Sequence, residues 1–511
     1  MPADVDIAII GGGPGGYSTA LRAAELGKSV ALIERDPSLG GTCLNRGCVP
    51  SKALITASRT LQSVQDASRM GIQASVSSID FDALRDYKLG VVETMTSGLA
   101  GLLARRGVVV YRGQAELADQ RTVVIRPSGG SDGSGQQGGN SGPDQVQRFN
   151  KADVAEDAGN EVRLTAKDIV LSIGSAPRPL PTNPFGGAII DSTQALNLDK
   201  FPASAVIIGA GAVAIEFATM WRQAGTDVSL LIRKDRVLSA WDRRVGSSLT
   251  RELKRQGIKV ISRSRVTGVD TRADGDASVH YQVEGQGASS KDGQETEDPT
   301  VFGQVVLVAI GRDPQTKADW FGSLGIELDE HGLVRTDPLG RTSVEHVWAL
   351  GDITAGPALA HRAFAQGIAI AEAIAGLNPR PVDPATVPTV VFSTPEAASV
   401  GLTAQEAKDR EDIRDVKETP YPMMGNARML MSGSAGSLTI VTGSYGDQEP
   451  VILGVHMLAP DASDLIAEAQ ELVGNRVPLS AAARLIHPHP TLSETLGEAL
   501  LKADGRPLHT L

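Results

Sequence analysis

Residues 6–16 of the chain read DIAIIGGGPGG, an apolar run that leads directly into a glycine-rich turn. The apolar run predicts a buried strand, and residues 17–26 after the turn have the pattern of a helix. A second apolar run at residues 29–33 predicts another strand, which completes a strand–helix–strand unit. Because such units assemble into parallel sheets covered by helices, this stretch predicts an α/β fold.

The glycines of this turn have the spacing of a dinucleotide-binding loop. Gly11, Gly13 and Gly16 form the pattern G-x-G-x-x-G, which permits a sharp turn, close approach of a pyrophosphate and packing of the helix on the strand. Glu34 follows 23 positions after Gly11, near the distance expected for an acid that binds ribose hydroxyls. A tight turn without a ligand is the alternative, but the strand, the helix and the acid together favour a nucleotide site.

The same pattern occurs a second time. Residues 205–214 read AVIIGAGAVA, in which Gly209, Gly211 and Ala214 take the three small-residue positions. A predicted helix and a second strand at residues 228–232 follow this loop. Two dinucleotide-binding units in one chain indicate two nucleotides.

The residue expected at the ribose differs between the two units. Counting 23 positions from Gly209 leads to Ile232 rather than to an acid, and Arg233 follows. An acid at this place favours NAD by bonding the 2′-hydroxyl, whereas a cation suits the 2′-phosphate of NADP. We therefore expect NADP(H) to be used at least as readily as NAD(H), with a solvated charge at a strand end as the alternative for Arg233.

The positions of the two loops divide the chain into three predicted domains. Residues 1–200 and 314–383 form the first dinucleotide-binding domain, residues 201–313 the second, and residues 384–511 a C-terminal domain. Residues 127–160 are rich in Gly and Ser and predict a surface loop, with a partner-docking arm as the alternative. The predicted fold class is α/β, with two Rossmann-like domains and a C-terminal α+β domain.

Composition excludes several classes of protein. The chain has 511 residues, which suggests about three domains. Its formal net charge of −11 argues against a nucleic-acid partner, and its apolar runs are too short for a transmembrane helix. The first residues lack the pattern of a signal peptide, so we expect a cytoplasmic protein.

The only two cysteines, Cys43 and Cys48, lie five positions apart. Four intervening residues allow their thiols to close a small ring, and the segment leads into a helix whose N-terminal potential would stabilise a thiolate. A second cysteine pair that could complete a tetrahedral metal site is missing, so no metal site is expected. Two inert cysteines are the remaining alternative, but the pattern favours a redox pair.

The segment GGTCLNRGCVPSK at residues 40–52 resembles the redox motif of the flavoprotein pyridine nucleotide–disulfide oxidoreductases. The resemblance extends from Asp6 to about Lys502. It implies FAD on the first nucleotide unit, NAD or NADP on the second, and a homodimer formed through the C-terminal domain.

Further positions match this family. The match implies that Lys52 lies beside the flavin ring with Glu216 as its partner, and that Asp352 contacts the ribityl chain of the flavin. Gly311 matches the motif that closes the nucleotide domain. The implied binding residues are Gly11, Gly13, Gly16, Glu34, Lys52 and Asp352 for FAD, and Gly209, Gly211, Glu216, Arg233 and Gly311 for NAD(P).

The C-terminal stretch HPHPTLSE at residues 487–494 resembles the signature of the dihydrolipoamide dehydrogenase branch of the family, with Pro488 where Ala is usual. By this match His489 is the catalytic acid and base, and Glu494 orients it. The chemistry agrees, because imidazole titrates near neutral pH and a carboxylate stabilises its cation. A histidine on a surface turn is the alternative. The implied activity oxidises dihydrolipoamide to lipoamide through the Cys43–Cys48 disulfide and FAD, with hydride transfer to NAD(P)+.

Two alternatives to this function remain open. Residues 229–233, SLLIR, look more like the NADP-binding strand of glutathione reductases, which favours an NADPH-dependent reductase of another low-molecular-weight disulfide or of quinones. The other alternative is a structural subunit of a 2-oxo acid dehydrogenase complex, against which the intact cysteines, His489 and Glu494 argue. The expected partners are therefore lipoamide, free or protein-bound, a second copy of the chain, and such a complex, with no nucleic acid and no membrane.

Overall fold

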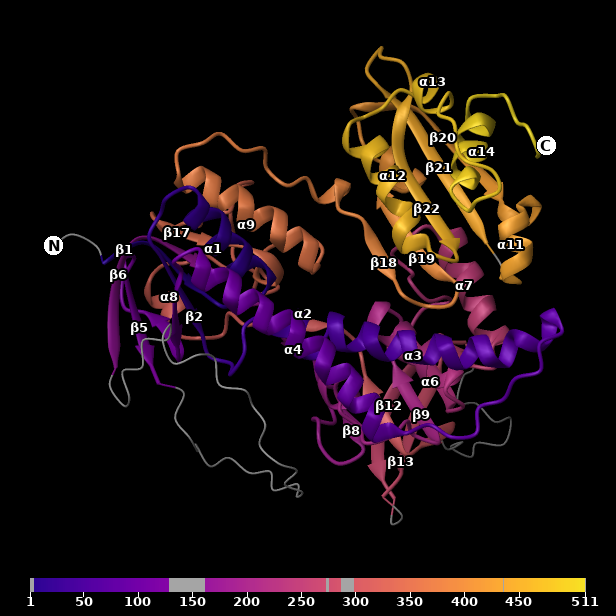
Figure 1. Cartoon of the computed structure of the whole chain (residues 1–511), viewed down its shortest axis with the longest axis horizontal. Helices are drawn as coiled ribbons and strands as arrows, with labels where there is room; N and C mark the ends of the chain where they lie inside the picture. The colour runs from indigo at the N-terminus through magenta and orange to yellow at the C-terminus, as the bar shows by residue number, and fades with distance from the viewer. Residues whose placement is uncertain (1–3, 128–160, 273–274, 286–297, 435, 511) are drawn as a thin grey trace. The chain divides into compact units, whose positions relative to one another are not determined.

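A computed structural model describes residues 4–127, 161–272, 275–285, 298–434 and 436–510. The chain divides into two compact units. The first unit comprises residues 1–51, 86–176 and 312–384, and the second comprises residues 52–85, 177–311 and 385–511. Figure 1 labels the helices and strands of both units.

The first unit is built around a seven-stranded sheet in the order β3-β2-β1-β6-β5-β4, with β17 also paired to β6. Parallel pairing joins β3, β2, β1 and the end of β6, and it also joins β17 to β6. The start of β6 pairs antiparallel with β5. The strands are β1 (Val5–Ile10), β2 (Val30–Glu34), β3 (Val109–Arg112), β4 (Gln114–Leu117), β5 (Thr122–Arg126), β6 (Val162–Leu171) and β17 (Val347–Ala349).

Two helices, α1 (Pro14–Glu25) and α9 (Ala360–Ile374), pack together on one face of this sheet (Figure 1). A Cβ at Gly367 of α9 would lie 2.7 Å from the carbonyl oxygen of Gly15, so the close approach of the helices requires this glycine. The other elements of this unit are α2 (Gly41–Arg46), α8 (Trp320–Ser323), η2 (Gly351–Ile353) and the strand pair β7 (Ser175–Pro177) and β16 (Arg312–Pro314). Two long helices, α3 (Cys48–Asp66) and α4 (Phe81–Arg105), contribute residues to both units.

The second unit contains a five-stranded parallel sheet in the order β11-β10-β9-β15-β8 and a three-stranded antiparallel sheet. Buried side chains of α6 and α7 pack against the parallel sheet. The elements are β8 (Ile189–Ile190), β9 (Ser204–Ile208), β10 (Asp227–Ile232), β11 (Lys259–Ser262), β12 (Ser264–Thr271), β13 (Ala277–Val283), β14 (Thr300–Gly303), β15 (Val305–Val308), η1 (Ala67–Met70), α5 (Ser192–Ala195), α6 (Ala212–Gln223) and α7 (Arg243–Arg255).

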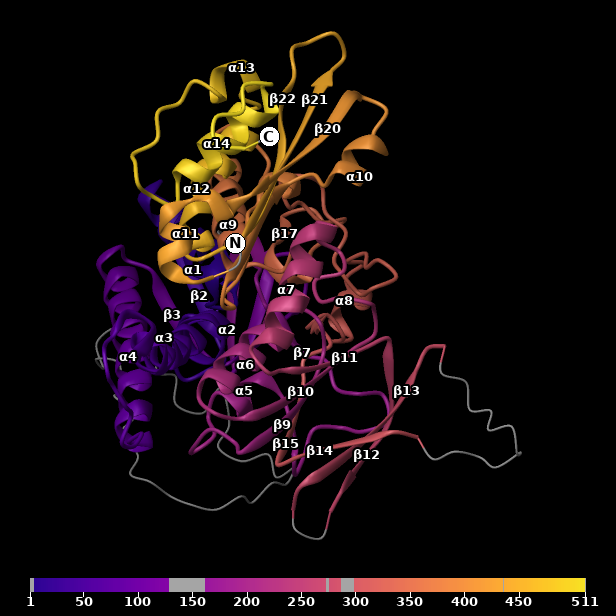
Figure 2. The same ribbon diagram turned by 90° about the vertical axis from the view of Figure 1, so that its right-hand side faces the viewer.

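The C-terminal part of the second unit is an antiparallel sheet in the order β18-β19-β22-β21-β20. Four helices, α11 to α14, cover one face of it, and α10 packs on the other (Figure 2). The elements are η3 (Pro384–Thr386), β18 (Thr389–Val391), β19 (Glu396–Gly401), α10 (Ala404–Lys408), β20 (Ile413–Pro422), η4 (Met423–Gly425), α11 (Ala427–Ser432), β21 (Ser437–Tyr445), β22 (Val451–Ala459), α12 (Ala462–Gly474), α13 (Leu479–Ala482) and α14 (Glu494–Ala503).

The predicted fold class is confirmed, since both strand–helix–strand units form parallel sheets and the C-terminal part is an α+β sheet. The predicted boundary at residue 200 differs from the unit boundary after residue 176, because β8 pairs with β15 of the second sheet. The three predicted domains stay a prediction. The expected surface loop falls on residues 128–160, outside the described residues. Among the residues described, no helix is long and apolar enough to cross a lipid bilayer.

Candidate functional site

The first glycine loop joins β1 to α1. Gly11 has a φ of +102°, and a Cβ here would lie 2.2 Å from the carbonyl oxygen of Ser172. A Cβ at Gly16 would lie 1.8 Å from the carbonyl oxygen of Gly11, so the turn and the helix leave no room for side chains. Gly13 is different, because the nearest atom to a Cβ there is the Cα of Gly41, at 3.8 Å. The loop is therefore closed toward the protein and open where a pyrophosphate would approach.

Glu34, the last residue of β2, lies beside this loop. Its carboxylate accepts hydrogen bonds from the N–H of Gly12 at 2.8 Å and from the N–H of Asp36 at 2.9 Å. Burial raises the pKa of Glu34, and these hydrogen bonds oppose the rise. Each oxygen retains a further lone pair that can accept from a ribose hydroxyl. Together with the uncapped N-terminus of α1, this arrangement fits a dinucleotide.

Asp352 belongs to a chain of hydrogen bonds in the first unit. Its Oδ2 accepts from the hydroxyl of Ser175 at 2.6 Å, and the Nε of Arg312 donates to that hydroxyl oxygen at 2.7 Å. Asp352 can therefore present its second oxygen to a ligand in a defined orientation. Sequence reasoning missed Ser175, which carries no motif of its own and is recognised only from its contacts.

The two cysteines lie at the junction of two helices. Cys43 is half-buried within the six-residue α2, and the exposed Cys48 is the first residue of α3. The segment thus enters a helix as expected, and the N-terminal potential of α3 favours a thiolate at Cys48. Tyr17 of α1 is a neighbour that the sequence did not indicate: its pKa is raised by burial and further by the two cysteines.

Lys52 and Glu216 meet in the second unit. The Nζ of Lys52 lies 2.9 Å from Oε2 of Glu216 and 4.4 Å from the ring centroid of Phe392. The other carboxylate oxygen of Glu216 accepts from the N–H of Phe392 at 3.1 Å. Because Glu216 is buried and both oxygens are engaged, it holds the ammonium group of Lys52 in place. This pairing agrees with the one that the family resemblance implies.

The second glycine loop joins β9 to α6 and has the same design as the first. Gly209 has a φ of +145°, and a Cβ there would lie 2.3 Å from the carbonyl oxygen of Ala309. A Cβ at Gly211 would meet no atom within 4 Å, and no side chain caps α6. Gly311 follows β15 with a φ of +142°. This loop is also open to a pyrophosphate.

Ile232 and Arg233 lie at the end of β10. The side chain of Ile232 is buried, whereas Arg233 is exposed and has no ion pair with any residue that the structure describes. Arg263 is a further exposed cation that sequence reasoning missed: it follows β11, and its N–H donates to the carbonyl oxygen of Lys234 at 3.0 Å. Pairing between β10 and β11, which aligns Ile232 with Ser262, brings these basic residues to one edge of the sheet.

His489 and Glu494 form a close pair at the start of α14. The Nδ1 of His489 lies 2.7 Å from Oε2 of Glu494. The side chain of His489 is 75% exposed and that of Glu494 is 16% exposed. Because a carboxylate only accepts, Nδ1 carries the proton, and Nε2 of the neutral ring is available to take a proton from a ligand.

The other histidine of the motif has a different environment. The Nε2 of His487 lies 2.8 Å from Oε1 of Glu468, and its side chain is 9% exposed. The hydrogen bond to Glu468 raises the pKa of His487, against a smaller opposing effect of burial. A Cβ at Gly497 would lie 2.3 Å from Nδ1 of this ring. His487 therefore packs into the fold, whereas His489 faces outward.

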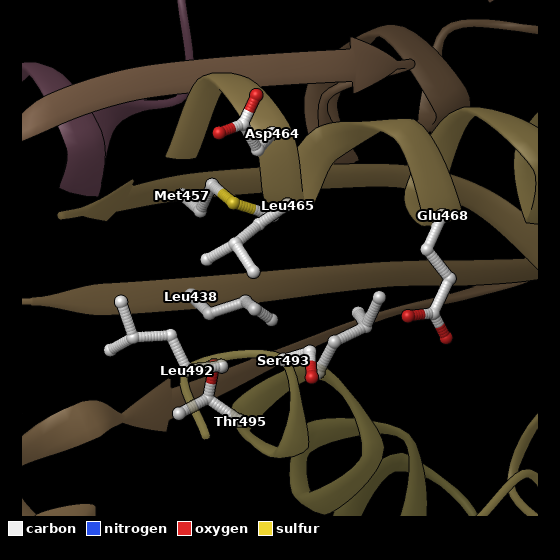
Figure 3. Close-up of a pocket in the computed structure, with 9 residues that line it drawn as sticks. Leu438, Met457, Asp464, Leu465, Glu468, Leu492, Ser493 and Thr495 are labelled. Atoms are coloured by element: carbon white, nitrogen blue, oxygen red, sulfur yellow. The ribbon is translucent and has the colours of Figure 1, made fainter. Parts of the chain in front are cut away.

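A cavity of about 120 Å³ lies between α12 and the residues around the start of α14 (Figure 3). Its lining includes Leu465 and Glu468 of α12 and Leu492 before α14, and it contains none of the predicted site residues. This volume is small against the roughly 300–1,000 Å³ of ligand pockets. The cavity is a gap in the packing rather than a cofactor site.

The predicted site residues are distributed over both units. The first unit contains Gly11, Gly13, Gly16, Glu34, Cys43, Cys48 and Asp352. The second contains Lys52, Gly209, Gly211, Glu216, Arg233, Gly311, His489 and Glu494. Within the units, the structure pairs Lys52 with Glu216 and His489 with Glu494.

Comparison with protein families gives two matches. Residues 5–367 match the pyridine nucleotide-disulphide oxidoreductase model, and residues 387–500 match the dimerisation domain of the same family. Together these matches cover most of the chain.

Comparisons with individual proteins agree. The chain is 36% identical to a dihydrolipoyl dehydrogenase of Geobacillus stearothermophilus over 99% of this chain and 98% of that protein. It is 34% identical to a dihydrolipoyl dehydrogenase of Bacillus subtilis over 100% of this chain and 98% of that protein. Among solved structures, LpdA of Mycobacterium tuberculosis matches with a TM-score of 0.81 and 24% identity, over 98% of this chain and 100% of that one, and supports the fold.

Proposed function

Because this chain belongs to the pyridine nucleotide-disulphide oxidoreductase family, we propose that it oxidises dihydrolipoamide to lipoamide and passes hydride to NAD(P)+. The chain is an FAD-dependent oxidoreductase. The observation that carries the choice of substrate is the His489–Glu494 pair, in a chain similar over its full length to dihydrolipoyl dehydrogenases.

In the proposed reaction, His489 begins by accepting a proton. Its Nε2 takes the proton of one substrate thiol, and Glu494 stabilises the resulting imidazolium through Nδ1. The substrate thiolate attacks the sulfur of Cys43 in the Cys43–Cys48 disulfide, so a bond to Cys43 forms and Cys48 leaves as a thiolate. The helix N-terminus at Cys48 stabilises this leaving group.

The second substrate thiol completes the exchange. Its proton passes to solvent, and the resulting thiolate attacks the substrate sulfur bound to Cys43, which closes the lipoamide disulfide and releases Cys43 as a thiolate. The electron pair now resides on Cys43 and Cys48. Bound FAD would accept this pair and supply hydride to the nicotinamide. The loop from Gly11 to Gly16, Glu34 and Asp352 would hold the FAD, and Lys52, fixed by Glu216, would place a positive charge at the flavin ring.

One observation favours a second candidate function. The basic edge formed by Arg233 and Arg263, with Ile232 in place of an acid, suits NADPH. The candidate is an NADPH-dependent reductase of another low-molecular-weight disulfide or of quinones. A structural subunit of a 2-oxo acid dehydrogenase complex is the candidate of another class.

Steady-state turnover distinguishes these functions. We expect the purified chain, loaded with FAD, to reduce NAD+ or NADP+ with dihydrolipoamide, and to run in reverse with lipoamide. Glutathione disulfide and quinones are the competing acceptors in the reverse direction. A higher specificity constant for glutathione disulfide or for a quinone than for lipoamide would show that lipoamide is not the preferred substrate. Absence of all turnover, with binding to a complex core in a pull-down, would favour the structural role.

We predict that NADP(H) is used at least as efficiently as NAD(H). A well-aligned Arg233 would make a charge-assisted hydrogen bond to the 2′-phosphate, worth roughly tenfold to a hundredfold in preference. In Ile232→Glu/Arg233→Ala the new carboxylate could accept from the N–H of Ala210, as Glu34 accepts from that of Gly12. The ratio of specificity constants for the two nucleotides should then move toward NAD(H).

Two single variants refine this nucleotide test. Arg263→Ala should lower the specificity constant for NADPH more than that for NADH. Arg251 is an exposed arginine on α7, and Arg251→Ala should change neither constant. A wild-type protein that strongly prefers NADH, and whose preference the double variant leaves unchanged, would show that other residues hold the ribose.

We also predict that the active site is shared between two copies of the chain. Residues 387–500 match a dimerisation domain, which supports a homodimer, and Ile486 near His489 is 97% exposed in the single chain. We infer that His489 of the partner subunit faces the cysteines of the first. Mixed dimers of Cys43→Ser and His489→Ala chains would then contain one intact site, and should regain activity that neither homodimer has. If verified mixed dimers regained no activity, the cysteines and His489 of one active site would have to come from the same chain.

A further inference from the structure

We propose that Asn426 is a positioning residue that holds Glu494, and through it His489, in the orientation needed for proton transfer. The proposal rests on the proposed function and deepens it. Asn426 lies at the N-terminus of α11, more than sixty residues before the histidine motif, and no sequence motif pointed to it.

The amide of Asn426 has one orientation that satisfies its contacts. Its Oδ1 accepts from the N–H of Arg428 at 2.9 Å and of Met429 at 3.1 Å, which caps α11. Since this oxygen must face two donors, the NH₂ group must point the other way. It donates to the carbonyl oxygen of Thr491 at 2.9 Å and to Oε1 of Glu494 at 2.7 Å. The buried amide uses all four of its ordinary hydrogen bonds.

These contacts fix the orientation of the Glu494 carboxylate toward His489. Oε1 of Glu494 is held by Asn426, so Oε2 is directed at Nδ1 of His489 at 2.7 Å. In the described part of the chain, Glu494 is the only hydrogen-bond partner of the His489 ring, which is otherwise exposed. The orientation of the imidazole therefore depends on Glu494, whose own orientation depends on Asn426.

Asn426 also fixes the loop before α14. Its bond to Thr491 ties the middle of the loop to α11. The hydroxyl of Thr491 donates to the carbonyl oxygen of Pro488 at 2.7 Å and accepts from the N–H of Glu494 at 3.3 Å. The loop is thus held internally by Thr491 and externally by Asn426.

Other ionisable groups surround Glu494. The pKa of Tyr421 on β20 is raised to about 12 by burial and by the carboxylates of Glu498 and Glu494. Glu494 also contributes to the raised pKa of His487, after the larger effect of Glu468. Asn426 is the neutral donor in this acidic surrounding, and its NH₂ group stabilises the negative charge of Glu494.

Two substitutions separate positioning from helix capping. Asn426→Asp retains the shape and the capping oxygen but replaces the NH₂ group by an acceptor that faces Glu494. Asn426→Ser retains a capping hydroxyl and loses the donor to Glu494. We expect kcat for dihydrolipoamide to fall about tenfold in Asn426→Ser and further in Asn426→Asp, with KM within about twofold.

The decisive measurement repeats Asn426→Ser in a Glu494→Ala background. If Asn426 acts through the carboxylate, the same change should there lower kcat by less than about twofold. An equal loss in both backgrounds, or no loss in wild type, would overturn the proposal. Thr403→Ala, which removes the cap of α10 in the same sheet domain, is the control and should leave kcat unchanged.

Folding and function are checked in parallel. Circular dichroism, flavin content and dimer formation should match wild type in all variants that are compared. His489→Ala separates a failure of the proposed function from a failure of the role of Asn426. If it retains activity, the proposed function fails; if it loses activity while both Asn426 variants retain it, only the role of Asn426 fails.

Discussion

Cys43→Ser and Cys48→Ser are each expected to reduce dihydrolipoamide-dependent turnover to background, because neither variant can form the disulfide that accepts the substrate electrons. This is the largest effect that we predict for any substitution. Both variants should fold and bind FAD, since Cys43 is only half-buried and Cys48 is exposed.

The two variants should differ in their absorption spectra. The family resemblance implies that Cys48 would lie against the bound flavin, and the start of α3 favours its thiolate. Cys43→Ser should therefore keep a long-wavelength absorption band from the Cys48 thiolate beside the oxidised flavin, and Cys48→Ser should lack it. Wild type should develop the band on two-electron reduction. Identical spectra for the two variants would refute the assignment of different roles.

His489→Gln is expected to lower turnover with dihydrolipoamide by about 10² to 10⁴, the usual contribution of a general acid or base. The remaining rate should rise with pH, because the substrate must then lose its thiol proton to solvent. The measurement is the pH dependence of kcat/KM in both variant and wild type. Glu494→Gln should show a smaller loss, since Nε2 of His489 is retained and only the charge that orients and stabilises the ring is removed.

His487→Gln is the matched control for His489. Its ring is paired with Glu468, so the substitution should affect stability more than turnover. The pKa of His487 is raised in the folded protein, so the pair stabilises the fold fully below the ordinary pKa of about 6.5, and this contribution is lost as pH rises through the raised pKa. The stability difference between His487→Gln and wild type should therefore shrink from acid to alkaline pH. A loss of turnover in His487→Gln equal to that in His489→Gln would contradict the assignment.

Several features were predictable from local sequence because local sterics decide them. The two glycine loops are examples: Gly11 and Gly209 have φ values of +102° and +145°, a backbone conformation that favours glycine whatever its tertiary neighbours are. The strands around these loops followed from continuous apolar runs, and β1 and β9 are buried as predicted. The sequence predicts the strands of the C-terminal sheet less precisely, since no comparable loop motif marks where they begin and end.

The contacts of the site were not predictable in the same way. Ser175, Arg263 and Asn426 are ordinary residues in sequence, and their importance appears only when distant segments meet. Ser175 meets Asp352 across 177 positions, and Asn426 meets Glu494 across 68. No local pattern encodes such separations, because they are set by how the strands pair and how the helices pack.

The sequence by itself determined the α/β class, the two nucleotide loops, the cysteine pair and the candidate histidine motif, because hydrophobic periodicity and short-range spacing specify them. The tertiary structure alone decided which of two neighbouring histidines is free to act. His487 and His489 are both followed by proline in the same motif, yet Glu468 on α12 and the close approach of Gly497 bury the first ring. The second ring is left exposed, with Nδ1 held by a carboxylate that Asn426 orients, since only the packing of α11, α12 and α14 on one sheet brings these groups together.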